Sequence, residues 1–505
     1  MLNSVKTSFR DSIIYGLGNI AVKIIGFLLI PLYTDPEYFS VDEFGIIAVL
    51  DITGLVLISL MASGLPQSLM RWYWDKDHTG NQKGIFFMSL MFQVFISLAF
   101  VLLLFPLGRQ LSSTIFSNTD WSRAIKLLVL SSALQAVNNL INTLMRVQSR
   151  SVLFTIVNMS KLAVVLILTI FFIVNRKMGV EGIYLAQVAG NMLFILILIP
   201  YVVRNSVPFF SMPLFREMSS YGFPLLLANF AAASLTVIDR YSLNSLALLK
   251  YVAVYTMAYK ISSVLKLVIV DSIKMAVTPL VLKKMYAPDN HRFYAKTMLY
   301  SSLVLMMGII AVSLFSYEII KVISRSSEFW IAFMVVPILA LSVFFMNMRE
   351  TTSYGLIIRK RTGVIGTTVV ISGILNIGLN IILIPLFNIT GAALATFVTQ
   401  LVFWSLNYYF SQKEYFIPYE KRKVAVMFIL GAILSFAGLA VNDMALFPRL
   451  AIKAACLLSF PFILYPFRFY EPAELQAIRG FYKKWSKLRD LGMNLKSLKN
   501  ISDEL

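Results

Sequence analysis

The stretch that decides the fold is KGIFFMSLMFQVFISLAFVLLLFP at residues 83–106, in which a single lysine precedes 23 residues without a charge. A helix of about 20 apolar residues is long enough to cross a hydrocarbon core of about 30 Å. The sequence therefore predicts an all-α, polytopic membrane protein. Similar runs recur along the chain, and they predict fourteen membrane-spanning helices, over residues 11–33, 44–66, 83–106, 122–145, 152–174, 180–203, 218–243, 251–278, 295–316, 329–348, 364–385, 391–411, 424–442 and 447–467.

The composition agrees with this class of protein. Hydrophobic residues make up 58% of the chain and charged residues 14%, whereas about a quarter of the residues of an average soluble protein are charged. No polar interval between the apolar runs is long enough to form a soluble domain. The single cysteine, Cys456, lies inside an apolar run, which excludes a disulfide framework and a cysteine-based metal site.

The charges in the loops alternate along the chain. The first loop, residues 34–43, carries four acidic residues and no basic one, and the next carries Arg71, Lys76 and Lys83. In the fourteen-span arrangement, 29 of the 45 Lys and Arg residues lie on the side of the termini, 8 on the opposite side and 8 within spans. The positive-inside rule therefore predicts that both termini are cytoplasmic.

The formal net charge of +20 does not indicate nucleic acid as a partner. These charges are concentrated in short loops and in the C-terminal tail, where they favour contact with anionic lipid headgroups. In the tail, Leu475, Ile478, Tyr482 and Trp485 recur at helical spacing among lysines. This pattern is typical of a helix that lies on a membrane surface.

Two halves of the chain resemble each other. VEGIYLA at 180–186 matches ITGAALA at 389–395, and Tyr15-Gly16 recurs as Tyr221-Gly222, with offsets of 206 to 209 residues. Paired bundles of this kind are how many transporters build a central site, although a duplication can also be inert ancestry. We predict six-helix lobes over residues 1–210 and 211–415, two further helices over 416–468, and a basic amphipathic tail over 469–505.

Basic residues inside spans point to an anion. Lys23, Lys161 and Lys260 fall deep within spans, and Lys266 lies as deep as Lys260 on another face of its helix. An ionisable group at such depth is costly unless it faces a bundle interior or a wet cavity. Because lysine and arginine both bind phosphate, we expect these lysines and Arg146 to line an anion-binding cavity, with snorkelling to the interface as an equal alternative for Arg146.

Other charges within the spans are expected to be structural or interfacial. Asp51 is the one acidic residue well inside the first bundle, and Asp239 and Arg240 are neighbours near the outer end of span seven. Pairing of Asp239 with Arg240 is one interpretation. For Asp271 and Lys274, pairing with each other is likewise one interpretation. Lys274, Arg349, Glu350 and Lys453 could instead snorkel to the interface.

Several short motifs resemble the O-antigen type of polysaccharide flippases. These belong to the superfamily that also holds the lipid II flippase and the multidrug and toxin extrusion transporters. The likeness covers essentially the whole chain through its length, its number of spans and its layout of six, six and two. The matching motifs are YG at 15–16 with Asn19, PLY at 31–33, EFGI at 43–46, GLP at 64–66 and IDR at 238–240.

This resemblance implies a transporter of the bacterial inner membrane that is not an enzyme. The cargo would be an undecaprenyl-diphosphate-linked oligosaccharide, carried from the cytoplasmic to the outer leaflet by alternating access. Lys23 and Lys260 match positions where such flippases often have cavity cations, and Asp51 and Asp239, with Arg240, are the candidates for gating or for coupling to protons or sodium. The implied partners are the lipid-linked oligosaccharide, membrane lipids, and polysaccharide polymerase and chain-length proteins.

Two other classes of function stay open at this point, a multidrug exporter and a membrane-embedded enzyme. A multidrug exporter of organic cations would need acidic cavity groups, and the presence of Asp51 alone against several deep lysines argues against it. A membrane-embedded acyltransferase would need an activated base, but His78 and His291 both lie in predicted cytoplasmic loops. A polysaccharide polymerase would be expected to have a long external loop, which this chain lacks.

Overall fold

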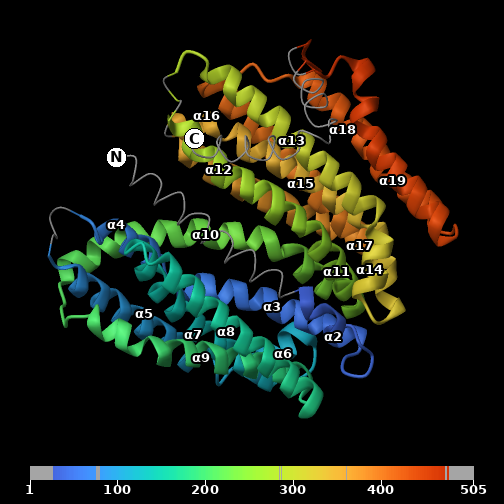
Figure 1. The fold of residues 1–505 in the computed structure, drawn as a ribbon. Helices are drawn as coiled ribbons and strands as arrows, with labels where there is room; N and C mark the ends of the chain where they lie inside the picture. Colours follow the sequence, from blue (N-terminus) through green and yellow to red (C-terminus); the bar gives the residue numbers. More distant parts are fainter. Residues whose placement is uncertain are drawn as a thin grey trace, which may run out of the picture.

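The computed structural model describes residues 27–75, 80–283, 285, 287–359, 361–472 and 475–476, and these form helices joined by short loops with no strand. Figure 1 shows two helical bundles with α10 running between them and α18 and α19 packed at one edge. The predicted all-α membrane fold is confirmed. Lys23, most of the first expected span and most of the basic tail lie outside the described residues.

The first bundle, here called the N-lobe, and α10, which follows it, contain nine α-helices and one π-helical turn in the described part of the chain. They are α2 (Ile30–Tyr33), α3 (Val41–Met61), α4 (Leu65–Trp72), α5 (Gln82–Leu104), α6 (Gly108–Phe116), α7 (Ser122–Val147), α8 (Ser151–Ile170), η2 (Phe171–Asn175), α9 (Gly179–Arg204) and α10 (Met212–Leu246).

The second bundle, here called the C-lobe, is followed by two appended helices. Its elements are α11 (Leu249–Leu265), η3 (Lys266–Val270), α12 (Asp271–Lys283), α13 (Asn290–Leu314), α14 (Ser316–Ile323), η4 (Ser327–Met334), α15 (Val336–Thr352), α16 (Tyr354–Ile358) and α17 (Thr362–Glu414). The appended elements are α18 (Lys421–Ala437), η5 (Gly438–Val441), α19 (Leu446–Ile463) and η6 (Tyr465–Phe467).

The number of spans is consistent with the predicted fourteen. Among the described residues, ten helices are long and apolar enough to cross a membrane, and the bent pair of η4 with α15 and α16 makes an eleventh. One of the ten, α17, is broken at Asn388 (φ 49°, ψ −124°) and holds two of the expected spans. Of the two remaining expected spans, one corresponds to α10, which carries charged residues at both ends, and most of the other, residues 11–33, lies outside the described residues.

Local sequence features set where the helices of span two begin and break. Ser40 caps α3 by accepting a hydrogen bond from the Glu43 amide, while the Glu43 side chain accepts one from the Ser40 amide, which satisfies two amides at the helix start. Gly64, at φ 72°, separates α3 from α4. A side chain at Gly64 would overlap the backbone of Gly222 in α10, so this turn lets two helices approach closely.

The two lobes are joined at one end. Figure 1 shows the bundles meeting near α2, α11 and α14 and lying further apart near α4, α12 and α16. At the joined end Phe44 packs edge-to-face on Phe329, with ring centroids 5.1 Å apart, and the Asn244 amide donates to the Ile115 carbonyl at 2.6 Å. A side chain at Gly45 would overlap the Leu249 carbonyl oxygen, so glycine permits the close contact between α3 and α11.

The appended helix α19 is held by a buried ionic cluster. The Lys453 ammonium, fully buried, donates to both carboxylate oxygens of Glu318 at 2.9 and 2.8 Å and to Asn442 Oδ1 at 2.7 Å. Arg449 lies 2.7 Å from the same carboxylate. The prediction that Lys453 snorkels to the interface is therefore wrong, because its partner is supplied by α14 in a distant part of the sequence.

Candidate binding cavities

The N-lobe contains a cavity of about 1050 Å³, lined by α3, α4, α7, α8 and α9. Its wall is rich in side chains that both donate and accept hydrogen bonds. Three charged groups, Asp51, Arg146 and Lys161, also face it. Seven carboxamides line it: Gln67, Gln135, Asn139, Asn142, Asn158, Gln187 and Asn191.

Lys161 is held in this wall by neutral groups. Its ammonium donates to Gln135 Oε1 at 3.0 Å and lies 3.4 Å from Asn191 Oδ1, and it lies 5.2 Å from the centroid of the Phe194 ring. No carboxylate of a described residue forms an ion pair with it. Amide oxygens stabilise the ammonium without neutralising it, so a positive charge remains available inside the bundle.

The amides on α7 and α8 form two hydrogen-bonded pairs. Gln135, Asn139, Asn142 and Arg146 are spaced by three or four residues, which places them on one helix face. Gln135 donates to Asn139 Oδ1 at 3.0 Å. Asn142 and Asn158 exchange two hydrogen bonds, of 3.3 and 2.9 Å, so the amide planes are fixed in the cavity wall.

The two remaining charged groups of this cavity are accessible. Arg146 is exposed and donates to Thr143 Oγ1 at 3.0 Å. Asp51 is also exposed although it lies in the middle of α3, and it accepts a hydrogen bond from Tyr184 Oη at 3.2 Å. Both therefore face the open space of the cavity.

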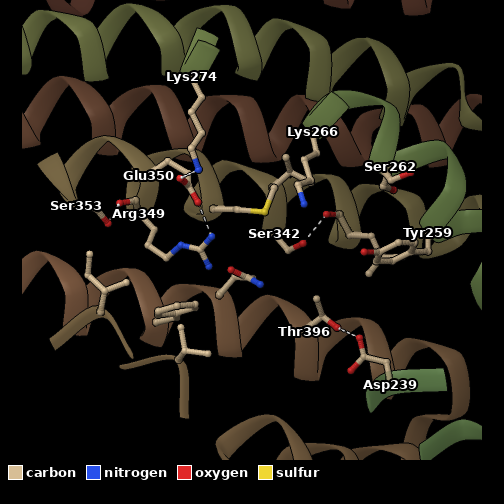
Figure 2. Close-up of a pocket in the computed structure, with 18 of the residues that line it drawn as sticks. Asp239, Tyr259, Ser262, Lys266, Lys274, Ser342, Arg349, Glu350, Ser353 and Thr396 are labelled. Atoms are coloured by element: carbon tan, nitrogen blue, oxygen red, sulfur yellow. Dashed lines mark hydrogen bonds and ion pairs between the residues drawn. The ribbon is translucent and has the colours of Figure 1, made fainter. Parts of the chain in front are cut away.

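The C-lobe contains a smaller cavity of about 440 Å³, drawn in Figure 2. Among the described residues that line it, two of the three cations, Lys274 and Arg349, share one carboxylate. Glu350 accepts from Lys274 at 2.6 Å and from Arg349 at 2.8 Å, and the Arg349 guanidinium lies 4.2 Å from the centroid of the Phe403 ring. Lys266 points into the space between these groups and Thr396 in Figure 2.

Asp239 lies at the edge of the C-lobe cavity in a network of neutral donors. It is 4% exposed and accepts from Tyr255 Oη at 2.7 Å, from Asn380 Nδ2 at 2.9 Å and from Thr396 Oγ1. Asn380 also donates to Asn376 Oδ1 at 3.2 Å. The Oδ1 atom of Asn380 is buried without a hydrogen-bond partner among the residues that the structure describes.

The structure separates the candidate residues into three groups. Arg146, Lys161 and Asp51 line the N-lobe cavity, and Lys266 and Asp239 line the C-lobe cavity. Lys260 and Arg240 lie elsewhere: Lys260 stacks over Phe44 at 5.3 Å, and Arg240 donates to Thr256 and stacks over Tyr259 at 4.1 Å. The lobe junction therefore holds a second set of cations.

Sequence reasoning missed several residues of these cavities. Asn158, Gln187 and Asn191 were not expected in the site, although Asn158 precedes Lys161 by three residues and Gln187 precedes Asn191 by four. That spacing on apolar helices was the available signal. Lys274 pairs with Glu350 of another helix rather than with Asp271.

A family model shows the family of the chain, and solved structures show its fold. Residues 8–285 match the family described as "Polysaccharide biosynthesis protein". No curated protein sequence matches the chain. Among solved structures, the lipid II flippase MurJ in an inward closed conformation is 15% identical, with 91% of this chain and 100% of that chain covered at a TM-score of 0.69.

Two further structures share the fold. An outward-facing multidrug resistance transporter of the MATE family and the MOP superfamily is 15% identical, covering 81% of this chain and 95% of that chain at a TM-score of 0.59. A MOP superfamily transporter from Pyrococcus furiosus has the same identity and coverage, with a TM-score of 0.57. At these identities the likeness establishes a fold shared with membrane transporters.

Proposed function

The chain belongs to the polysaccharide biosynthesis protein family, and on that premise we propose that it flips an undecaprenyl-diphosphate-linked oligosaccharide across the bacterial inner membrane. The cargo is an O-antigen or capsule repeat unit, and it moves from the cytoplasmic to the outer leaflet. The observation that carries this proposal is Lys161, a deep cation whose hydrogen-bond partners among the described residues are amides, in a cavity of about 1050 Å³.

The diphosphate is the part of the cargo that Lys161 and Arg146 would bind. When an anion arrives, Lys161 gives up only hydrogen bonds to uncharged amide oxygens, and a phosphate adds the attraction of an opposite charge to the hydrogen bonds that replace them. Arg146 provides a second cation on the same face of the cavity. The exchange of amide oxygens for phosphate oxygens is therefore favourable.

The carboxamides suit the sugar part of the cargo. A sugar hydroxyl is both donor and acceptor, and so is an amide side chain. The buried Oε1 of Gln67 has no hydrogen-bond partner among the described residues, so it is available to accept from a hydroxyl. A wall of seven amides binds an uncharged oligosaccharide without selecting for charge.

Alternating access would operate at the joined end of the lobes. In the predicted topology this end faces the outer leaflet, so the structure corresponds to an inward-facing form. Outward opening requires separation of Thr53 from Tyr241, whose hydroxyls are 2.7 Å apart, and of Asn244 from Ile115. Lys260 and Arg240 lie near the same junction, and Asp51 or Asp239 would couple this opening to protons or sodium. Polymerase and chain-length proteins would act on the flipped cargo.

The decisive test is flipping of a polyprenyl-diphosphate oligosaccharide by purified protein in vesicles. We expect Lys161→Gln to slow flipping at least about 10-fold, because a charge-assisted contact is worth about 1.5–3 kcal/mol. Lys126→Gln is the matched control, since Lys126 lies in the same lobe but does not line the cavity. Equal rates for wild type and Lys161→Gln would contradict the proposal.

The exposed carboxylate of Asp51 keeps one alternative, export of organic cations. Among the described residues that line the N-lobe cavity, Asp51 is the one acidic group, and Arg146 and Lys161 are the two basic ones. Uptake of a cationic dye into the same vesicles distinguishes the two functions. Dye transport that is lost in Asp51→Asn, with no oligosaccharide flipping by the wild type, would replace the flippase proposal.

A further inference from the structure

A separate pocket lies where α18 begins and where the chain leaves α19. It encloses about 430 Å³. Three basic side chains, Arg422, Lys423 and Arg468, line it together with one acidic one, Glu420. Val426, Pro466, Phe467 and Phe469 form its apolar wall. The pocket is thus positively charged on one side and apolar on the other.

The carboxylates around this pocket already have partners. Glu420 is paired with Lys296 at 2.7 Å and with Lys423 at 2.6 Å, and Glu471 is paired with Lys296 at 2.5 Å and with Arg292 at 3.4 Å. Glu420 and Glu471 therefore hold Lys296 and Lys423 in place.

Arg422 and Arg468 have no such partner. Both are exposed, and neither forms an ion pair with a carboxylate in the part of the chain that the structure describes. Two guanidinium groups that line one pocket without a counter-charge create a site for an anion. Phosphate is suitable, because guanidinium groups bind it with paired hydrogen bonds.

The backbone of Arg468 supports this interpretation. Arg468 adopts φ 55° and ψ 37° just after η6, a left-handed conformation that normally favours glycine at a helix end. A side chain at such a position costs about 1 kcal/mol. Glycine would remove this local strain, but it would also remove a basic side chain from the lining of the pocket.

An exposed apolar stripe leads to the pocket along α19. The stripe consists of Leu458, Phe462 and Tyr465, whose spacing of four and three residues places them on one face. All three side chains are more than half exposed. In a membrane protein such a face contacts acyl chains. The same segment continues into Pro466 and Phe467, which line the pocket.

From this arrangement we propose that the pocket binds an anionic phospholipid of the surrounding leaflet. The headgroup phosphate lies between Arg422 and Arg468, and the acyl chains follow Leu458, Phe462 and Tyr465. In the predicted topology this is the cytoplasmic leaflet, whose anionic lipids are attracted to such basic pockets. The site is distinct from both cavities and does not depend on the proposed transport of a glycan.

Lipid titration of the full-length protein in detergent, followed by native mass spectrometry, tests the proposal. The probes are phosphatidylglycerol and zwitterionic phosphatidylcholine. We expect phosphatidylglycerol to bind more tightly, and Arg422→Gln with Arg468→Gln to weaken it about 30-fold, since each basic group near the headgroups contributes about five-fold. Arg109→Gln with Arg176→Gln removes the same charge from exposed positions elsewhere and should leave the affinity unchanged.

Arg468→Gly separates binding from folding. Glycine relieves the left-handed strain, so the variant should melt at the wild-type temperature or above it while its affinity for phosphatidylglycerol falls about five-fold. Wild-type affinity in Arg468→Gly would overturn the proposal. Equal binding of the two lipids, or selective binding of undecaprenyl phosphate over phosphatidylglycerol, would do so as well.

Discussion

The two cavities hold similar charges in different ways. In the N-lobe, Lys161 is bound by amide oxygens of Gln135 and Asn191. In the C-lobe, Lys274 and Arg349 share the carboxylate of Glu350. The N-lobe cavity is also more than twice as large, at about 1050 Å³ against about 440 Å³.

This difference determines what each cavity offers to an anion. A phosphate that approaches Lys161 replaces uncharged amide acceptors, whereas one that approaches Lys274 competes with a bound carboxylate. Removing one partner of a paired charge in a protein interior leaves the other uncompensated, which is costly. The N-lobe cavity is therefore suited to binding, and the pair at Glu350 is suited to holding α12 against α15.

The largest effect is expected from breaking the C-lobe pair. Glu350→Gln leaves Lys274 and Arg349 without their counter-charge. We expect the free energy of unfolding to fall by about 2 kcal/mol. This loss is smaller than for a fully buried pair because Lys274 is half exposed. Thermal unfolding in detergent measures this loss. Glu328→Gln, at an exposed position, is the control and should change little.

The same variant tests the comparison of the cavities. With Glu350 neutral, Lys274 and Arg349 join Lys266 as cations of the C-lobe cavity without a carboxylate partner among the described residues. We therefore expect pyrophosphate to bind Glu350→Gln more tightly than wild type. An unchanged melting temperature together with unchanged pyrophosphate affinity would show that the pairing has no energetic role.

The two acidic groups allow a second test. Asp239 is buried among Tyr255, Thr396 and Asn380, while Asp51 is open to the cavity. Oxygen-rich, enclosed surroundings suit a small cation, so we expect Asp239→Asn to remove the response of flipping to a proton or sodium gradient, a change of about 10-fold. Asp51→Asn should keep that response. The reverse result would place coupling in the N-lobe.

A smaller effect is expected from the paired amides of Asn142 and Asn158 in the N-lobe cavity. Asn158→Leu removes both hydrogen bonds to Asn142, and we expect the affinity for a lipid-linked oligosaccharide to fall about five-fold, since a neutral hydrogen bond contributes about 1 kcal/mol. Binding of undecaprenyl diphosphate without sugar should be unaffected in the same variant. Asn347→Leu, a buried amide that lines neither cavity, should lower stability without this selectivity.

The sequence predicts the fold well because the signal is local. Each span is a continuous apolar run, and a missed span would have assigned every later loop to the wrong side of the membrane and removed the charge asymmetry between the two sides. The GLP motif at residues 64–66 marks the turn after α3, where Gly64 takes φ 72°. Helical periodicity alone also places Gln135, Asn139 and Asn142 on one face of α7.

Pairing between distant helices is what the sequence does not determine. Helical spacing suggested Asp271 as the partner of Lys274, but Glu350 lies 76 residues away and contacts it through the packing of α12 against α15. Lys453 likewise finds Glu318 across 135 residues. Depth within a span predicts that a charge needs a partner, and only the packing shows which group supplies it.

The smallest effect concerns paired charges that lie outside the spans. Burial raises the pKa of Glu420, but hydrogen bonds from Lys296 and Lys423 outweigh it and lower that pKa below its ordinary value of 4.5. The hydrogen bond from Lys296 likewise lowers the pKa of Glu471. Both carboxylates therefore stabilise the fold fully above about pH 4.5, and this contribution is lost as the pH falls through the lowered values.

The melting temperature should accordingly stay flat from about pH 8 to pH 5 and fall slightly below about pH 4, where both carboxylates gain protons. Glu471→Gln should remove part of that fall. Because Glu471 is a solvated partner, its pair contributes little, and the change in melting temperature should be smaller than for Glu350→Gln. A larger loss of melting temperature in Glu471→Gln than in Glu350→Gln would contradict this order. It would mean that the ion pairs of Lys296 with Glu420 and Glu471, rather than the pairs at Glu350, stabilise the C-lobe more.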